Sequence, residues 1–583
     1  MCGILTVVSK KEKALDAKVC RRALSSLANR GPDYRSDTLI NPCVYFGQTI
    51  LSLTGKVGED PGRHLRSRSG RYRISFNGEL YNYRDLNAKG PKLEGDFTDS
   101  EVLVNLFEQH TPRELQSKLD GMYAYAVMDE KEKVLRFVRD PLGEKSLYVF
   151  ENDQMVVVSS EIPPIRALIG SLSLQQDVFK DYFHTRHFMF ESQTPYENIR
   201  QIRPGEVWSY NLEQNRFVGR DRWSALDLIQ ESEYENYSRR SEEDLTRELD
   251  RLFSQCAREM IPQGRSFATV VSGGIDSSLI SAHLLEYGQP QVLVAVNHVG
   301  KDQISDDLTL FEKALGKKID RLDVDKLKYA WEISRCQRVL GSPLLSHSFI
   351  GQSVQSEFVR RQGCKALFGG EGGDELFGGY GTYLSLQAAG VDENSRFSPS
   401  HYTEWKASAL FPRYESALTE ELHQVWKECL ARYAFIRDSQ ERTLQAMMAA
   451  DFVFQLPAVG LRGADLMSMM WSLETRSVLV RKPLARFGLN LPLKMKLRAS
   501  APTREQTKWL LKQAFKLKYP AELIVQKQGF SGFPNEAGEF LGSKEDYLSL
   551  DFLNLKASQV ADLDRATEWK LMNMEYFLRT QNL

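Results

Sequence analysis

Residues 268–278, ATVVSGGIDSS, decide the fold of the larger part of the chain. The four-residue run ATVV has the composition of a buried strand, and two glycines separate it from a helix-forming segment. A strand–turn–helix unit of this kind presents backbone N–H groups and the positive end of a helix to a phosphate. The Gly-Lys-Ser/Thr ending of a Walker A loop is missing, so a different nucleotide-binding loop is indicated.

Asp276 lies at the mouth of this turn, where a bare carboxylate would repel a phosphate. Its position makes chemical sense if a divalent cation such as Mg²⁺ lies between the carboxylate and a pyrophosphate. Ser272, Ser277 and Ser278 add hydroxyl donors around the same loop. A generic glycine turn at the start of a helix is the alternative, and the sequence favours the nucleotide site.

Short apolar segments alternate with helical patterns around this motif. QVLVAVNH (291–298) and DRLDV (320–324) have the pattern of strands, DDLTLFEKALG (306–316) that of a helix, and the strand-like KALF opens CKALFGGEGGDELFGGY (364–380). This alternation predicts an α/β domain with a parallel sheet, over residues 246–583, whose part beyond about residue 400 is mostly helical.

Residues 1–210 have a different pattern. Short runs rich in Val, Tyr, Phe and Ile, such as GILTVV and RYRISFNGELYN, are separated by polar turns, and two helical stretches interrupt them at 17–30 and 100–110. The pattern predicts a layered α+β domain. Residues 211–245 are polar with little periodicity and are predicted to be a linker, followed by a helix capped by Ser241.

Cys2 follows the initiator methionine, whose removal would make it the N-terminal residue. Its α-amine, with a pKa of about 7.7–8.0, would then lie beside a thiol with a pKa of about 8.5 and could take its proton. A nucleophile activated by a terminal amine is a known catalytic arrangement. An inert, buried cysteine at the end of a strand is the alternative.

Five further motifs accompany the N-terminal MCGI. They are NRGPD (29–33), FNGELYNY (76–83), TDSE (98–101), LDGMYAYAVMD (119–129) and RDPLGEKSLY (139–148). In this order and at these separations they resemble the glutaminase domain of class II glutamine amidotransferases, closest to glutamine-dependent asparagine synthetases. The resemblance implies an N-terminal-nucleophile hydrolase fold, an αββα sandwich.

The resemblance also implies roles in glutamine hydrolysis. Cys2 would attack the side-chain amide, Asn77 and the N–H of Gly78 would form the oxyanion hole, and Asp99 would hold the substrate ammonium. The implied glutamine-binding residues are Arg30, Ile50, Leu51, Ser52, Asn77, Gly78, Glu79 and Asp99. Ile50 departs from the family, which has an arginine there for the glutamine carboxylate. Either Arg63, Arg66 or Arg68 replaces that arginine, or glutamine binds weakly.

The second half of the chain resembles the ATP-pyrophosphatase domain of the same family. SGGIDSS matches its pyrophosphate loop, and LFGGEGGDELFGGY (367–380) matches its second signature. Glu371 and Lys527 are the catalytic residues implied here, and Asp276 and Asp374 are the implied ligands of Mg²⁺. The implied ATP-binding residues are Val271, Ser272, Gly273, Gly274, Asp276, Ser277, Val296, Gly369, Gly370, Lys508 and Lys527.

The acceptor pocket of the family carries the pattern SxExRxPFLD, which reads SLETRSVLVRKPL (472–484) here. Glu474 and Arg476 are kept, whereas Val478 replaces the proline and Arg481 replaces the final aspartate. The implied acceptor-binding residues are Glu371, Asp374, Glu474, Arg476 and Arg481. The change at Arg481 has two open interpretations, namely drift within a structural ion pair or an acceptor other than free aspartate.

Composition limits the remaining functions. The 583 residues carry 42% hydrophobic and 26% charged residues and a net charge of −1, which predicts neither a nucleic-acid surface nor a membrane protein. The seven cysteines form no CxxC pair, so a zinc site or a disulfide framework is not indicated and a reducing cytoplasm is the expected location. The lack of CxxC and of a basic surface also counts against a tRNA-modifying enzyme.

The sequence therefore predicts a glutamine-hydrolysing, ATP-dependent and Mg²⁺-dependent amide-forming ligase that uses small-molecule substrates, with a homodimer as an open alternative to a monomer. Ammonia from glutamine would attack an adenylated carboxylate, with aspartate as the default acceptor. Two alternatives stay open. The same chemistry could serve a natural-product or polysaccharide acceptor, or the chain could be a catalytically reduced, nucleotide-binding relative.

Overall fold

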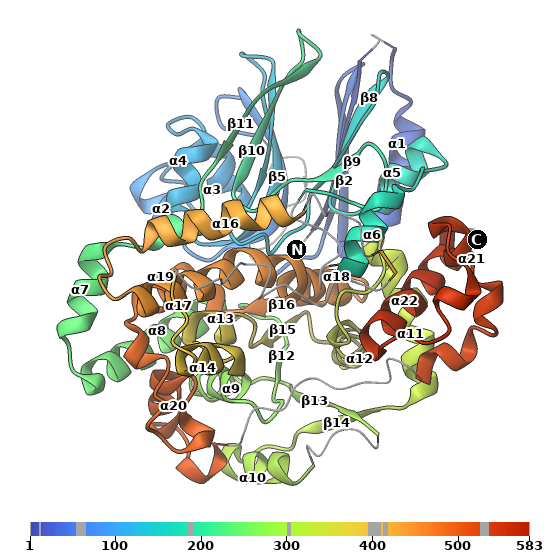
Figure 1. Ribbon diagram of the computed structural model, residues 1–583. Coiled ribbons are helices and arrows are strands. Elements are labelled where there is room, and N and C mark those ends of the chain that lie inside the picture. The colour runs from blue at the N-terminus through green and yellow to red at the C-terminus, as the bar shows by residue number, and fades with distance from the viewer. Residues whose placement is uncertain are drawn as a thin grey trace.

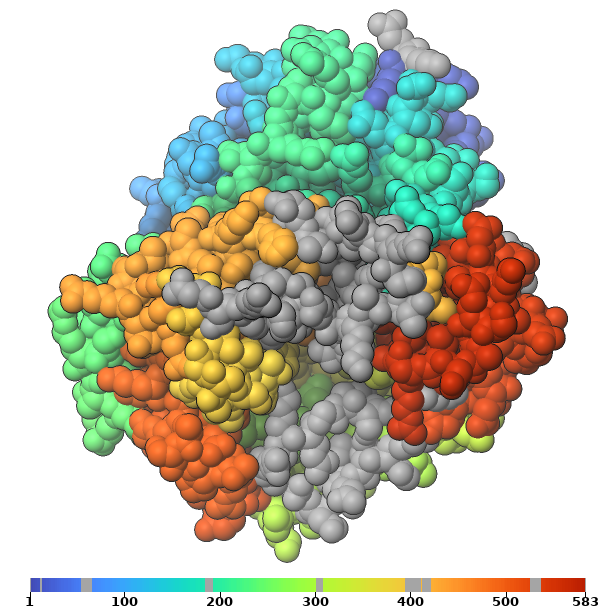
Figure 2. Space-filling view, viewed as in Figure 1, coloured from blue at the N-terminus to red at the C-terminus, as the bar shows by residue number. Residues whose placement is uncertain are grey.

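The computed structural model describes residues 2–10, 13–53, 66–184, 192–299, 305–393, 410–411, 418–524 and 536–581. Figure 1 shows two stacked parts, with the N-terminal strands above and the parallel sheet and most helices below. In the space-filling view of Figure 2, the blue to green N-terminal residues form the upper lobe. The orange helix α16 (Leu418–Arg432) runs along the lower edge of this lobe.

Two antiparallel sheets pack face to face in the N-terminal part. The first has the strand order β2-β3-β1-β8-β7-β9 and the second β11-β10-β6-β5-β4. The strands are β1 (Cys2–Ser9), β2 (Tyr34–Asn41), β3 (Val44–Ile50), β4 (Tyr72–Leu80), β5 (Gly121–Asp129), β6 (Val134–Arg139), β7 (Tyr148–Glu151), β8 (Met155–Ser159), β9 (Ile199–Gln201), β10 (Glu206–Asn211) and β11 (Arg216–Arg222).

Helices cover the outer faces of both sheets, as Figure 1 shows. They are α1 (Ala17–Leu24), α2 (Tyr83–Lys89), α3 (Asp99–Leu106), α4 (Pro112–Lys118) and α5 (Ile162–Ile169), whereas α6 (Gln176–His184) lies below the sheets and packs against residues 548–581. Ile4, Phe46, Ala126 and Phe137 belong to one buried cluster between the sheets. Strands covered on both faces are apolar along their whole length rather than alternating, which explains runs such as GILTVV. The predicted αββα sandwich is confirmed.

The structure does not have the linker predicted for residues 211–245, because part of this segment is regular secondary structure. Residues 216–222 form β11, which pairs with β10 at the edge of the second sheet, and α7 (Glu231–Arg239) follows. Most of the β11 side chains are exposed, and the strand lies at the edge of the sheet with a partner on one side only. An exposed edge strand lacks the alternating apolar pattern by which strands are recognised, so its polar sequence resembles that of a connector.

The second part contains a parallel sheet with the order β14-β13-β12-β15-β16. The strands are β12 (Phe267–Val270), β13 (Val292–His298), β14 (Asp320–Val324), β15 (Ala366–Gly369) and β16 (Glu474–Ser477). Phe267 and Phe368 lie in the cluster that contains α8 and α9, whereas Ala268 and Leu367 pack with Val359 of α12. Neighbouring residues of a strand point to opposite faces, so both faces of this sheet are covered by helices, as predicted for α/β.

The helices of this part surround the sheet and extend to the C-terminus. They are α8 (Glu242–Met260), α9 (Ile275–Tyr287), α10 (Ser305–Leu315), α11 (Lys326–Leu340), α12 (Ser348–Arg361), α13 (Gly373–Phe377), α14 (Gly381–Ala388), α16, α17 (Ser439–Ala450), α18 (Arg462–Met469), α19 (Lys482–Asn490), α20 (Trp509–Lys516), α21 (Leu548–Leu553) and α22 (Arg565–Gln581). Ser241 caps α8 by accepting the N–H of Asp244, as its sequence predicts.

The helix Ser439–Met469 is long and apolar enough to span a membrane. It joins α17 and α18 through a π-helical segment, Asp451–Leu461. Its most apolar window is 72% buried inside the protein, which is the behaviour of a core helix. No other helix among the described residues passes the same test of length and composition.

Strand order places the nucleotide motifs. From β12 the chain moves outward to β13 and β14, then returns to the opposite side of β12 to form β15. The loops after β12 and β15 therefore leave the same edge of the sheet at the point where the direction of winding reverses. Ligands of open α/β sheets bind at this point, so SGGIDSS and GEGGDE meet where a nucleotide is expected.

Candidate active sites

Cys2 begins β1 and is buried, with 6% of its surface exposed. Its strand partner is Ile50 of β3, and its backbone N–H donates to Oδ1 of Asn77 at 3.2 Å. The Nδ2 group of Asn77 donates in turn to Ser160 at 3.4 Å. Cys2 and the predicted oxyanion residue Asn77 are therefore brought together, although 75 residues separate them in the sequence.

The thiol of Cys2 accepts a hydrogen bond from Nε2 of Gln48 at 3.4 Å. Oε1 of Gln48 accepts the N–H of Phe76 at 3.1 Å, which fixes the amide orientation. Burial raises the pKa of the Cys2 thiol, and the Gln48 contact partly opposes that rise. Gln48 was not predicted as a site residue. Its position two residues before Ile50 on the same strand face was the available signal.

Gly78 lies where the backbones of β4 and β5 leave no room for a side chain. A Cβ atom at this position would lie 2.1 Å from the carbonyl oxygen of Met122 and 2.7 Å from Cα of Tyr123. Only a residue without a Cβ atom can occupy this position. Glycine therefore allows residue 78 to pair with Tyr123 and keeps its N–H next to Asn77.

Gly78→Ala is expected to push β4 away from β5, because backbone atoms cannot yield as a flexible side chain does. We expect a loss of about 1–3 kcal/mol of stability, typical of overpacking, and a loss of glutaminase activity larger than the loss of folded protein. Urea unfolding and glutamate release measure the two effects. Gly219→Ala is the matched control, because nothing lies within 4 Å of a Cβ added there on β11; equal behaviour of both variants would refute the close-packing argument.

Asp99 is buried at the start of α3 and accepts the N–H of Leu80 at 3.0 Å. Burial raises the pKa of its carboxyl group, and a substrate ammonium would favour the charged form. Leu51 and Ser52 follow β3 and are buried, with the Ser52 N–H donating to Asp33 at 2.8 Å. The roles of these residues and of Ile50 in glutamine binding stay predictions.

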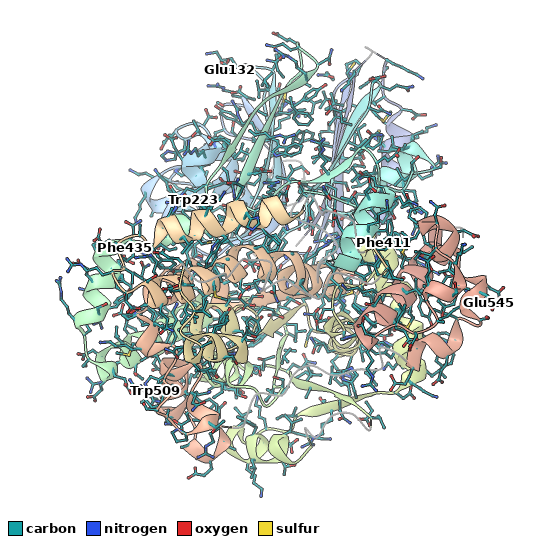
Figure 3. The ribbon with its side chains drawn as sticks, in the orientation of Figure 1. Glu132, Trp223, Phe411, Phe435, Trp509 and Glu545 are labelled. Atoms are coloured by element: carbon teal, nitrogen blue, oxygen red, sulfur yellow. The ribbon has the colours of Figure 1, made fainter. Side chains whose placement is uncertain are left out.

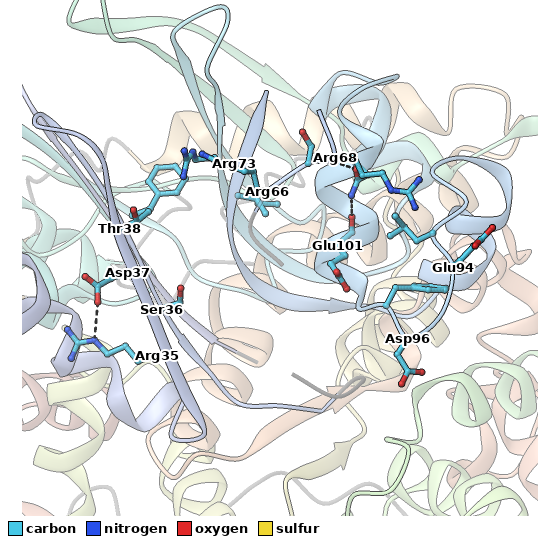
Figure 4. A pocket seen from close by; sticks show the side chains of 16 residues that line it. Arg35, Ser36, Asp37, Thr38, Arg66, Arg68, Arg73, Glu94, Asp96 and Glu101 are labelled. Carbon is cyan, nitrogen blue, oxygen red and sulfur yellow. Dashed lines mark hydrogen bonds and ion pairs between the residues drawn. The ribbon is translucent and has the colours of Figure 1, made fainter. Parts of the chain in front are cut away.

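A cavity of about 900 Å³ lies beside this region. In Figure 4, Arg35, Ser36 and Asp37 of β2 line one side, and Glu94, Asp96 and Glu101 line the other. Arg66 and Arg68, two of the proposed replacements for the family arginine, also line it, and Arg68 donates to the carbonyl of Pro91 at 3.2 Å. Arg63 lies outside the described residues.

Arg30 is buried and holds three groups together. Its guanidinium donates to the carbonyl of Cys2 at 3.0 Å, to Glu161 at 2.9 Å and to both oxygens of Asp465 at 2.9 and 3.0 Å. Asp465, on α18 of the second part, also accepts from Lys145 at 2.9 Å. Arg30 thus fixes the carbonyl of Cys2 and anchors it to the second part through Asp465, which no motif pointed to; its role in glutamine binding stays a prediction.

The SGGIDSS loop has the predicted strand–turn–helix form. Gly273 has a φ of +79°, and Gly274 is the N-cap of α9. The hydroxyl of Ser277 accepts the N–H of Ser272 at 3.1 Å and so closes the loop. Val271 is fully buried behind it, and Val296 is buried in the neighbouring β13.

Three residues distant in sequence meet at the mouth of this loop. The Nζ atom of Lys508 lies 2.5 Å from Asp276 and 2.7 Å from Asp374. Gly370, Gly373 and Gly379 make room for them, since a Cβ on Gly373 would lie 2.3 Å from Oδ1 of Asp276. Two carboxylates within reach of one small cation in a glycine-lined cradle fit a divalent metal, so Asp276 and Asp374 are suited to the predicted Mg²⁺.

Glu371 follows β15 and faces β16. Burial raises the pKa of its carboxyl group, and the hydroxyl of Ser477 donates to it at 3.2 Å. Gly369 is at the end of β15, where a Cβ would lie 2.2 Å from Oε2 of Glu371. Lys527, the second predicted catalytic residue of this part, lies outside the described residues.

Glu474 and Arg476 form a fully buried ion pair at 2.7 Å on β16. The same guanidinium also pairs with Glu79 of β4, the residue after Gly78. Burial raises the pKa of Glu79 to about 8, while the guanidinium outweighs burial at Glu474 and lowers its pKa. Arg476 therefore reaches toward the N-terminal part, and its role in acceptor binding stays a prediction.

Arg481 is buried between the two parts. Its guanidinium donates to Asp120 of the first part at 3.0 and 2.5 Å and to Glu259 of α8 at 2.7 Å. Beside it, Nζ of Lys482 lies 4.6 Å above the ring of Trp223, which Figure 3 labels below the sandwich. The geometry is that of a structural ion pair, one of the two interpretations that the sequence left open.

Lys496 is buried beside α17 and donates to Gln445 of that helix at 2.8 Å. Burial lowers its pKa to about 7, against about 10.4 in an unfolded chain, despite the opposing charge of Glu441. Between pH 7 and 10.4 the unfolded chain therefore binds more protons than the native one, and folding stability rises with pH over this window.

Lys496→Met is expected to flatten this rise, so that its stability relative to the wild type is highest at or below pH 7 and declines toward pH 10.4. Urea unfolding at a series of pH values measures the slope. Lys494→Met, at an exposed position two residues earlier, should leave the slope as in the wild type. A wild-type slope in Lys496→Met would show that the buried amine does not titrate in this window.

Comparisons with known proteins agree with this geometry. A glutamine amidotransferase domain model matches residues 1–223, and an asparagine synthase model matches residues 248–577. Asparagine synthetase [glutamine-hydrolyzing] 1 of Bacillus subtilis is 25% identical over 588 residues, covering 92% of this chain and 87% of its own. Putative asparagine synthetase [glutamine-hydrolyzing] 1 of Methanocaldococcus jannaschii is 26% identical over 409 residues, covering 65% and 69%.

One solved structure, the glutamine phosphoribosylpyrophosphate amidotransferase of B. subtilis, covers 51% of this chain and 75% of its own. Its TM-score of 0.29 at 16% identity is too low to bear on function. The asparagine synthase model alone spans more than half of the chain, and the amidotransferase model covers most of the rest. The chain is a member of the asparagine synthase family of glutamine-hydrolysing ligases, with an N-terminal-nucleophile glutamine amidotransferase domain followed by a synthetase domain.

Proposed function

We propose that the chain transfers ammonia from glutamine to a carboxylate that it activates with ATP, with aspartate as the acceptor and asparagine, AMP and pyrophosphate as products. The observation that carries this proposal is the position of β16. On this strand Arg476 contacts Glu79 beside the oxyanion residues, and the next residue, Ser477, donates to Glu371 at 3.2 Å. One short strand thus touches both sets of candidate catalytic residues.

In the first reaction, the Cys2 sulfur attacks the amide carbon of glutamine, and the carbonyl oxygen becomes an oxyanion held by Asn77 and the Gly78 N–H. The leaving nitrogen takes up the proton that the thiol gave up, the carbon–nitrogen bond breaks and ammonia departs, and water then hydrolyses the thioester to glutamate. Because burial raises the pKa of the thiol, a base is needed. The α-amine of Cys2, once Met1 is removed, is that base. Asp99 holds the substrate ammonium.

In the second reaction, a carboxylate oxygen of the acceptor attacks the α-phosphorus of ATP, and pyrophosphate leaves. Ammonia then attacks the acyl carbon, the bond to AMP breaks, and the nitrogen loses a proton. Glu371, whose pKa is raised by burial, is placed to take that proton. Asp276 and Asp374 would hold Mg²⁺, which neutralises phosphate charge when bound.

Transfer of ammonia inside the protein is part of this proposal. Ammonia released into water at neutral pH becomes ammonium, which has no lone pair for attack. The junction beside β16 is buried, because Arg476 and Glu474 are each 0% exposed. A protected route along this strand would keep the nitrogen neutral between the two sites.

The acceptor is the part of the proposal that most needs a test. Arg481 was the reason to consider an acceptor other than free aspartate, and its ion pairs with Asp120 and Glu259 support the alternative interpretation of a structural ion pair. Pyrophosphate release from ATP should therefore be measured across a panel of carboxylic acids, with ammonia or glutamine as nitrogen donor. We expect aspartate to stimulate release. Stimulation by another acid alone would refute aspartate, and no response to any acid would refute the synthetase activity.

A further inference from the structure

We propose that the ammonium group of Lys508 takes the place of a divalent cation between Asp276 and Asp374 in the nucleotide-free protein, so that the metal enters only together with phosphate groups. This inference rests on the proposed synthetase function, which assigns the metal and the nucleotide to this site. It concerns the order of binding and the residue that enforces it.

The contacts place Lys508 where a cation would lie. Its Nζ atom is 2.5 Å from Asp276 and 2.7 Å from Asp374, and both distances are within ion-pair contact. An ammonium has three donors and no acceptor, so it satisfies carboxylate oxygens much as a small metal ion does. A metal ion that bound both carboxylates at about 2.0–2.6 Å would leave no room for this ammonium.

The surroundings hold Lys508 in this position. Its side chain is 7% exposed, and a Cβ on Gly379 would lie 2.1 Å from its Cε atom. Its backbone has a φ of +51°, in the left-handed region that non-glycine residues seldom adopt, where it is the N-cap of α20. The following Trp509 donates its N–H to the carbonyl of Lys496 at 2.9 Å. Lys508 is therefore a fixed, buried partner of the two aspartates and not a surface lysine near them.

Phosphate groups offer the means of exchange. The SGGIDSS loop and the start of α9 lie at the same carboxylates, since Asp276 is in the first turn of that helix. A bound pyrophosphate group would give the Lys508 ammonium anionic oxygens to pair with and would add oxygen ligands for the metal. Without phosphate, a metal must displace a buried ammonium from both carboxylates, so its affinity is low.

The test is Mn²⁺ binding to the full-length protein, measured with and without inorganic pyrophosphate. The electron paramagnetic resonance signal of free Mn²⁺ reports how much of the metal stays unbound. The wild type is expected to show an Asp276-dependent Mn²⁺ site only with pyrophosphate, and Asp276→Asn defines which binding belongs to this site. Lys508→Met is expected to bind Mn²⁺ without pyrophosphate at least about tenfold more tightly than the wild type, because the ammonium that competes with the metal for both carboxylates is removed.

Lys512→Met is the matched control. It removes one positive charge one turn further along α20, from a buried lysine whose Nζ donates to the carbonyl of Thr507 at 2.6 Å. It should not produce the tenfold gain. An equal gain in Lys512→Met would show a general charge effect and overturn the proposal, as would a wild type that binds Mn²⁺ alone as tightly as Lys508→Met.

Folding of each variant is checked by circular dichroism, and Lys508→Gln, with a similar length and no charge, replaces Lys508→Met should the latter unfold. A wild type that fails to bind Mn²⁺ even with pyrophosphate also overturns the proposal. Failure of the proposed function has a different signature. In that case no carboxylic acid would stimulate pyrophosphate release, while the nucleotide-free Mn²⁺ difference between wild type and Lys508→Met would persist.

Discussion

Replacing Cys2 with alanine is expected to lower glutamate release from glutamine by on the order of 10⁴-fold or more, because the nucleophile is removed and no other group in the site can form the thioester. Synthesis supported by added ammonia should continue, since the synthetase residues Asp276, Glu371 and Lys508 lie in the other part of the chain. Measuring both reactions on one preparation separates loss of the nucleophile from loss of the fold.

Cys20→Ala is the control for this experiment. Cys20 is also buried in the first part, on α1, and its exposure of 2% is similar to that of Cys2. We expect Cys20→Ala to retain glutaminase activity, with at most a small loss of packing. If Cys2→Ala released glutamate at the rate of the wild type, the assignment of Cys2 as the nucleophile would be refuted.

Asp465→Asn is expected to destabilise the protein by about 3–5 kcal/mol, the usual cost of breaking a buried ion pair from one side. Asp465 has a side-chain exposure of 1% and binds Arg30 and Lys145, both at 2.9 Å. The substitution keeps the shape of the side chain, so the two cations are left buried with one anion fewer. Arg30 also donates to the carbonyl of Cys2, so glutaminase activity should fall as well.

The pH dependence of this effect has a defined sign. Burial alone would raise the pKa of Asp465, but Arg30 and Lys145 outweigh it and lower that pKa. A carboxylate with a lowered native pKa contributes stability that is complete above its unfolded pKa of about 3.9 and is lost as the pH falls through the native value. The difference between wild type and Asp465→Asn should therefore be constant near neutral pH and shrink in acid.

Glu243→Gln is the matched control, because it breaks an exposed ion pair with Arg247 whose side chains are 74% and 67% exposed. Exposed pairs of this type contribute about 0.3–0.5 kcal/mol. Urea unfolding compares the variants by the midpoint of the first transition, because a protein of two domains need not unfold in one step. If the urea midpoint of Asp465→Asn shifts as little as that of Glu243→Gln, water reaches the buried ion-pair cluster and the expected loss of about 3–5 kcal/mol is refuted.

Local patterns predicted much of both domains. The alternation of strands and helices after residue 246 gave the parallel sheet, and the two glycine-rich motifs follow β12 and β15 as predicted. These predictions succeed because side-chain periodicity and turn chemistry act over a few residues. β11 was missed for the same reason, since an exposed edge strand carries no such periodicity.

The sequence by itself determined the two domain types, the nucleophile candidate Cys2 and the composition of the nucleotide loop. Only the tertiary structure decided the partners of the charged residues. Arg481 pairs with Asp120, Arg476 with Glu79, Arg30 with Asp465, and Lys508 with Asp276, across separations of 232 to 435 residues. The physical reason is that a buried charge requires an opposite charge in contact, and only the packing of distant elements determines which one is there.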